Sequence, residues 1–188
     1  MKKMKWLVAS LFLLVCFGIA SAQATKPTEP RTVSSVLNRS VTGVENEFVP
    51  AADAMPENKY SFAPTSGEFK GVRTFAQEIK HVAAVNYEIG GAILQEKPPA
   101  DTGEESGPAS VTSKADIMKY LKDSFAYLHK AMNSINEKNE VEGVKNPFGE
   151  GTAARLDLAI SGISHPFDHY GQMVEYLRMN GIIPPASR

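Results

Sequence analysis

The chain has 188 residues, of which 43% are hydrophobic and 22% are charged, proportions that are ordinary for a soluble globular domain. Its 20 Lys and Arg residues are matched by 21 Asp and Glu residues, so there is no basic surplus to neutralise phosphates, which argues against a dedicated nucleic-acid binder. The single cysteine excludes a disulfide framework and a cysteine-ligated zinc site.

Residues 1–22 have the layout of a secretory signal peptide. Three lysines precede an apolar stretch over residues 6–19, which is short for a spanning helix, and the small residues at 20–22 suit cleavage. Cleavage there would also remove the only cysteine, Cys16. We therefore expect an exported protein, periplasmic or extracellular, and an uncleaved membrane anchor is the alternative.

Residues 23–31 are polar, hold two prolines and are predicted to form a flexible tether. The apolar periodicity beyond them predicts four helices: over about 32–55, from Thr74 with apolar positions to Ile93, from Ser113 with apolar positions to Ile135, and over about 152–180. No stretch alternates with the period of a β-strand over a useful length. The predicted fold is therefore all-α, a four-helix bundle over residues 32–185.

Capping residues mark where two of these helices begin. Thr74 with Gln77, and Ser113 with Asp116, fit the capping-box spacing. Pro50, by contrast, is expected to kink the first helix or end it early, because proline lacks the backbone N–H and its ring clashes with the preceding turn.

Two helices show clear apolar stripes that are expected to face the core. In the third helix the stripe is Met118, Leu121, Phe125, Leu128, Met132 and Ile135. In the fourth it is Leu156, Ile160, Ile163, Phe167, Tyr170, Val174 and Leu177. Two histidines of the fourth helix lie beside its stripe, so we expect them at the edge of the core, near a cleft.

These histidines, His165 and His169, are four residues apart, a spacing that places both imidazoles on one helical face within reach of one ion. His81 on the second helix is the candidate third ligand, since bundle sites take ligands from facing helices. Pro166 lies between the pair and Gly162 precedes it, which predicts a kink; a helix break before His165 is the alternative. Such a pair also arises by chance, and His81 alone would be an ordinary core-edge histidine.

The order of these parts resembles the DinB/YfiT-like superfamily. The resemblance covers about residues 32–185 and is carried by QEIKHVA around His81, by the long third helix and by HPFDHYGQMVEYLRMNG from His165, including the family's Gly-Gln step at Gly171 and Gln172. It implies a four-helix bundle with His81, His165 and His169 as ligands of a divalent transition metal, for which we favour Zn or Ni. Known members include metal-dependent transferases that use low-molecular-weight thiols and a thiol-dependent isomerase.

The resemblance favours a metal-dependent S-transferase or hydrolase, in which the metal activates a thiol or a water against a small electrophile; residues 1–22 add the expectation that it is exported. The familiar thiol-using members are cytoplasmic, where such thiols are plentiful, whereas this chain is expected to be exported. A metal-activated water is therefore an alternative nucleophile to a thiol. Gln172 and Tyr176, on the histidine face, are candidates for orienting a bound ligand. The alternatives are a non-catalytic metal-binding bundle and a metal-free interaction bundle. The protein could form a homodimer. We do not expect it to bind nucleic acid, or a membrane once the signal peptide has been cleaved.

Overall fold

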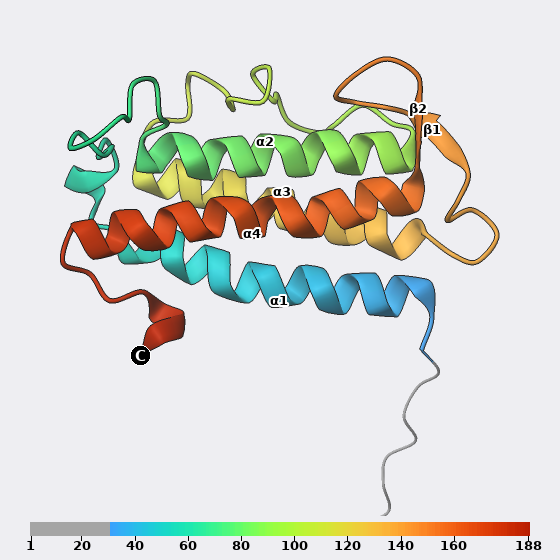
Figure 1. Ribbon diagram of the computed structural model, residues 1–188. Coiled ribbons are helices and arrows are strands. Elements are labelled where there is room, and N and C mark those ends of the chain that lie inside the picture. Colours follow the sequence, from blue (N-terminus) through green and yellow to red (C-terminus); the bar gives the residue numbers. More distant parts are fainter. Residues whose placement is uncertain (1–30) are drawn as a thin grey trace, which may run out of the picture. The chain divides into compact units, whose positions relative to one another are not determined.

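The structure, a computed structural model, describes residues 31–188 (Figure 1). The predicted signal peptide, and the tether up to residue 30, lie outside the described residues. Within the described part the chain is mostly helical, and the prediction of four helices is confirmed. They are α1 (Val33–Ala54), α2 (Phe75–Leu94), α3 (Lys114–Ser134) and α4 (Arg155–Met179), with short 3-10 turns η1 (Glu57–Lys59) and η2 (Pro185–Ser187). No helix over residues 31–188 combines the length and hydropathy needed to cross a membrane.

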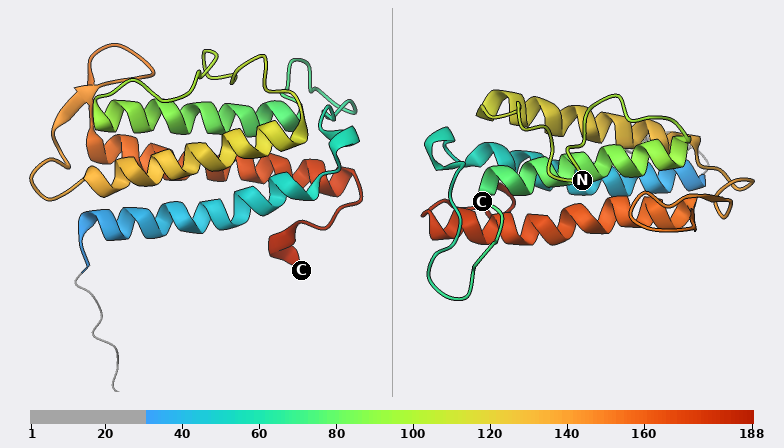
Figure 2. Two further views of the ribbon diagram at one scale, coloured as in Figure 1. Left: turned by 180° about the vertical axis from the view of Figure 1, so that it is seen from behind. Right: turned by 90° about the horizontal axis from the view of Figure 1, so that it is seen from above.

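The four helices form a bundle in which α1 and α4 run in one direction and α2 and α3 in the other (Figures 1 and 2). Helix α4 contacts both α1 and α2, and α3 contacts the same two helices. Because α2 and α3 are parallel, the connector between them, residues 95–113, has to return along the bundle and lies beside α2. This topology puts α4 and the connector on two sides of α2.

Local sequence signals account for the helix starts. The Thr74 hydroxyl accepts a hydrogen bond from the Gln77 backbone N–H, and the Gln77 side chain accepts one from the Thr74 N–H, which is the predicted capping box. Ser113 likewise accepts from the Asp116 N–H. Pro50 does not end α1 early: the helix continues through it to Ala54, and the proline lies on the exposed face.

The apolar stripe predicted for α3 is confirmed, since all six of its residues are buried. The stripe predicted for α4 is wrong. Ile160 and Phe167 are 54% and 41% exposed, and most of the others are half-buried at the edge of the core. The buried face of α4 consists instead of Arg155, Leu158, Ala159, Gly162, Pro166, His169, Met173, Tyr176 and Leu177.

Small residues explain why this other face of α4 is the buried one. A Cβ placed on Gly162 would lie 3.2 Å from Leu128 Cδ1 of α3 and 3.5 Å from Ile89 Cγ2 of α2. The backbone of α4 therefore approaches its neighbours closely at Gly162, which a bulky apolar stripe would prevent. The helix is continuous through the buried Pro166, so the alternative of a helix break before His165 is also wrong.

A two-stranded hairpin precedes α4 and was not predicted. Strands β1 (Gly143–Lys145) and β2 (Thr152–Ala154) pair antiparallel, with Val144 opposite Ala153. Three-residue strands are too short to show a period of two. The fourth helix was therefore predicted to begin at about residue 152, which includes the residues of β2. Arg155, the first residue of α4, fixes the hairpin by an ion pair with Glu142 at 2.6 Å and a hydrogen bond to the Ile93 carbonyl at 3.2 Å.

The α2–α3 contact yields a first prediction. A Cβ on Gly90 would lie 2.7 Å from two ring atoms of Tyr127, so Gly90→Ala is expected to destabilise the fold by about 1–3 kcal/mol. Gly43→Ala is the matched control, because nothing lies within 4 Å of a Cβ there and alanine favours the helix by about 0.5–1 kcal/mol. Urea unfolding of both variants measures the difference; equal midpoints would contradict the close α2–α3 approach.

Candidate metal centre

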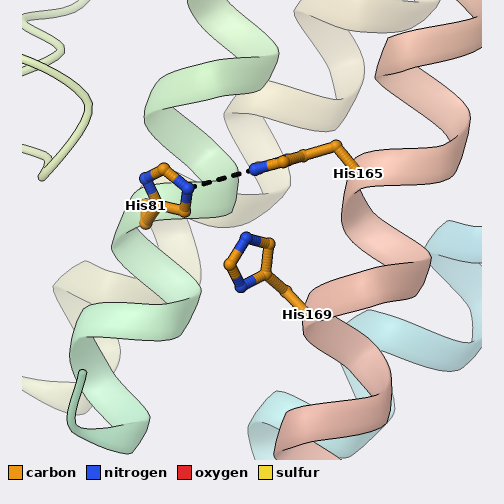
Figure 3. Close-up of side chains that lie close together, drawn as sticks. All are labelled: His81, His165 and His169. Atoms are coloured by element: carbon orange, nitrogen blue, oxygen red, sulfur yellow. Dashed lines mark hydrogen bonds between the residues drawn. The ribbon is translucent and has the colours of Figure 1, made fainter. Parts of the chain in front are cut away.

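Three histidines from two helices converge on one point. His81 comes from α2, and His165 and His169 come from adjacent turns of α4 (Figure 3). One ring nitrogen of each lies within 4.8 Å of the others, and Nε2 of His81 is 3.0 Å from Nε2 of His165. Two nitrogens bound to one tetrahedral metal lie roughly 3.3 Å apart, so the three imidazoles lie close enough together to hold one metal ion.

Burial favours the neutral, metal-binding form of the His81 and His165 imidazoles. His81 and His169 are each only 6% exposed, and His165 is half-buried. Desolvation, together with the neighbouring His169 and His81, lowers the pKa of His165 to about 3. Desolvation also lowers the pKa of His81. Because a ligating imidazole has to be unprotonated at the metal, the lowered pKa values of His81 and His165 keep these two side chains ready for a cation.

The connector between α2 and α3 orients His81. Nδ1 of His81 lies 2.6 Å from the Glu105 carbonyl oxygen, which can only accept, so Nδ1 carries the proton and Nε2 faces the cluster with its lone pair. The connector turns sharply there: Gly103, Glu104 and Glu105 all have positive φ values, of 54°, 52° and 68°. Two non-glycine residues in this strained region are typical of a functional site.

A buried carboxylate orients His169. Glu78 is 1% exposed and accepts a hydrogen bond from Nδ1 of His169 at 2.5 Å. This contact leaves Nε2 of His169 for the cluster, as in the carboxylate–histidine–metal arrangements of metalloproteins. Sequence reasoning missed Glu78, although a signal was present: it lies one helical turn before His81, next to the core residue Ile79.

His165 supplies a further test of whether a metal fits. Its Nε2 lies 3.0 Å from Nε2 of His81 and has to donate to it, because Nδ1 of His81 already holds that ring's proton. Nδ1 of His165 is then an acceptor, and it is buried with no hydrogen-bond partner among residues 31–188. A cation at the cluster would take lone pairs from all three Nε2 atoms in place of the contact between Nε2 of His165 and Nε2 of His81, so the donor set fits a metal ion. Nδ1 of His165 would then carry the proton and would still have no hydrogen-bond partner among residues 31–188.

A pocket of about 370 Å³ adjoins His81 and His165. Its lining comes from α2, the connector, the hairpin and α4. The remaining lining residues are Val85, Ile89, Glu105, Phe148, Ser161 and Ser164. Small-molecule sites are commonly this large, mostly apolar and equipped with a few polar groups. The cluster therefore has open space beside it, as the sequence led us to expect for a site near a cleft.

The other two predicted site residues lie close to the cluster. The Gln172 side-chain nitrogen is 3.5 Å from Nδ1 of His169 and donates to Asp168 at 3.4 Å. Tyr176 is buried, and its hydroxyl donates to the Arg73 carbonyl at 3.1 Å. Neither residue lines the pocket beside His81 and His165, and their role in binding a ligand stays a prediction.

Comparisons with known proteins bear on the fold. A sequence profile described as the DinB superfamily matches residues 41–173. A DinB-like protein from Bacillus cereus has 17% sequence identity and a TM-score of 0.65, over 80% of this chain and 95% of that one. A conserved protein from Enterococcus faecalis has 16% identity and a TM-score of 0.63, over 80% and 98%. A comparison of this sequence with curated proteins found no match. At such low sequence identities, the similarity to these two structures supports the fold alone.

The Glu78–His169 contact predicts how tightly a metal is held. Glu78→Ala removes the acceptor that orients His169, and the affinity for Zn²⁺ should fall about 10- to 100-fold. Glu78→Gln keeps a neutral hydrogen-bond acceptor for His169, so its affinity for Zn²⁺ should fall less. Glu175→Ala, on the exposed side of α4, is the control. Competition with a chromogenic chelator measures the three affinities, and an unchanged affinity in Glu78→Ala would contradict the assignment.

Proposed function

Because the chain belongs to the DinB superfamily, we propose that it is a metal-dependent protein in which His81, His165 and His169 hold a divalent transition metal, Zn or Ni. The observation that carries this proposal is the convergence of the three imidazoles, two of them oriented by partners at Nδ1. Imidazole nitrogens suit these borderline metals.

We propose further that the protein is an enzyme, a transferase or hydrolase acting on a small electrophile with a thiol or water as nucleophile. Three protein ligands leave a coordination position open, the arrangement of catalytic rather than structural zinc sites. A metal held there lowers the pKa of a water or thiol that ligates it. The pocket beside His81 and His165 gives a substrate access to that position, and Val85 and Ile89 make one wall apolar.

A non-catalytic role is the second candidate, and one observation favours it. The cluster takes one histidine from α2 and two from α4, so an ion bound there would link the two helices. If this link is the whole function, removing the metal should lower the melting temperature strongly and the pocket should accept no ligand at the metal. Export, suggested by residues 1–22, belongs to the proposal, with the periplasm or the medium as its location.

Metal content tests the proposal directly. We expect about one equivalent of a transition metal in the protein purified without a polyhistidine tag, and loss of it in His81→Ala and His165→Ala. His129→Ala is the control, because His129 lies between α1 and α3 and contacts Asn38 and Glu45. Plasma mass spectrometry measures the metal. No metal after reconstitution with Zn, Ni, Fe and Cu would exclude both the enzyme and the metal link between α2 and α4.

A further inference from the structure

A cavity of about 430 Å³ beside the start of α2 is the feature that goes beyond the proposed function. Its lining includes two basic residues, Arg73 and Lys80, and no Asp or Glu from residues 31–188. Gln77 and Ser106 add an amide and a hydroxyl, both of which can hydrogen-bond a ligand. The charged residues of this lining are therefore all positive.

Neither basic side chain is paired with a carboxylate. Among the ion pairs of residues 31–188, none involves Arg73 or Lys80. The Lys80 ammonium donates instead to the Pro108 carbonyl oxygen at 2.6 Å. Burial lowers the pKa of Lys80, and no carboxylate of the described residues offsets that effect. An anion in the cavity would therefore meet two cations that have no acidic partner of their own.

The connector between α2 and α3 holds the Lys80 side chain along the cavity. A Cβ on Gly107 would lie 3.0 Å from both Cβ and Cε of Lys80, and this glycine has a positive φ of 71°. The carbonyl of the next residue, Pro108, then fixes the ammonium. A charge held in place before a ligand arrives loses less entropy when it binds one.

Arg73 relates this cavity to the histidine cluster. Its positive charge lies near enough to lower the pKa of both His81 and His165. At His81 this effect is larger than the opposite effect of the Glu105 carboxylate. Lys80 also directly precedes His81 in α2. The cavity therefore adjoins the cluster, and a divalent ion bound there would add to the attraction for an anion.

We propose that this cavity binds the anionic group, a carboxylate or a phosphate, of a small ligand whose reacting end lies at the histidine cluster. The planar guanidinium of Arg73 suits two oxygens of such a group, and the ammonium of Lys80 adds a second positive charge. This inference rests on the proposed metal site and names the substrate class of that site.

Titration of simple anions into the protein as purified is the first test. Succinate, glycerol phosphate and the neutral succinamide are compared, and the amide resonances of Gly71 and Gly107 report binding in this cavity. We expect at least one anion to bind, the tighter one identifying the preferred group, and succinamide not to bind. Arg73→Gln should weaken the anion about fivefold, the scale of a partly exposed charge pair. Arg73→Lys keeps the charge and should weaken it less.

The chain offers a matched control for Arg73→Gln. This substitution keeps the backbone carbonyl that accepts the hydrogen bond from the Tyr176 hydroxyl. Lys97→Gln removes the same charge from a different cavity, beside the end of α2, where Glu88 and Glu96 also line the wall. It should leave the anion affinity unchanged.

Thiols test whether the same ligand also reaches the metal. Mercaptoalkanesulfonates of increasing chain length are each compared with the mercaptoalkanol of the same length in the Co²⁺-loaded protein, where a sulfur ligand produces a thiolate-to-cobalt absorption band that reports its Kd. At the best length, Arg73→Gln should weaken the sulfonate about fivefold relative to the alcohol. The tighter anion of the first test should compete with the sulfonate and not with the alcohol.

The outcomes separate this inference from the proposed function. If neither anion shifts the two glycine amides, or if Arg73→Gln binds them as tightly as the unchanged protein, the anion site is overturned while the metal site stands. If the anions bind but Co²⁺ does not, the metal site is overturned, and with it the place of the reacting end. If Arg73→Gln affects sulfonate and alcohol equally at every length, or the anion displaces both, the cavity and the metal do not share a ligand and the inference fails.

Discussion

The close approach of α4 to α2 and α3 is the contact on which the histidine cluster depends. At Gly162 the α4 backbone meets the side chains of Ile89 and Leu128 with no room for bulk. The same face of α4, one and two turns further on, carries Pro166 and His169 into the bundle. A larger side chain at Gly162 would hold the helices apart and move His165 and His169 away from His81. The packing of α4 at Gly162 therefore also fixes the relative positions of the three histidines, because close-packed interiors transmit small displacements.

Burying polar groups at this contact has a cost that the hydrogen bonds offset. Glu78 is nearly inaccessible, and a buried carboxylate without partners would be strongly unfavourable. Its bond to His169 satisfies it and at the same time turns the free nitrogen of that ring toward the cluster. The Glu105 carbonyl does the same for His81 from outside the bundle. The bundle and the connector thus each orient one histidine, whereas the hydrogen bond of the His165 ring among residues 31–188 is to His81.

Much of this arrangement could be predicted from sequence, for identifiable reasons. Capping pairs such as Thr74 with Gln77 are local, and the seam of α3 follows strict periodicity, so the helices and one core face could be inferred. The i, i+4 spacing of His165 and His169 is also local, and His81 was the candidate ligand on a facing helix before the resemblance supported it. The buried face of α4 was missed because bulk, rather than small size at Ala159 and Gly162, was taken to mark the core. Glu105 and the β1–β2 hairpin reach the site through tertiary contacts that leave no periodic signal.

The connector and the hairpin, which were hard to predict, contribute to the lining of the pocket but contribute no histidine to the cluster. The histidines and Glu78 belong to helices, whose packing fixes their positions within narrow limits. Glu105 and Phe148 belong to the connector and the hairpin, where substitution changes the lining without disturbing the bundle. A rigid scaffold can hold one metal centre while such segments alter what reaches it. Under the proposed function, these two segments vary the pocket lining, whereas the α2 and α4 residues that also line it are fixed by the packing of the bundle.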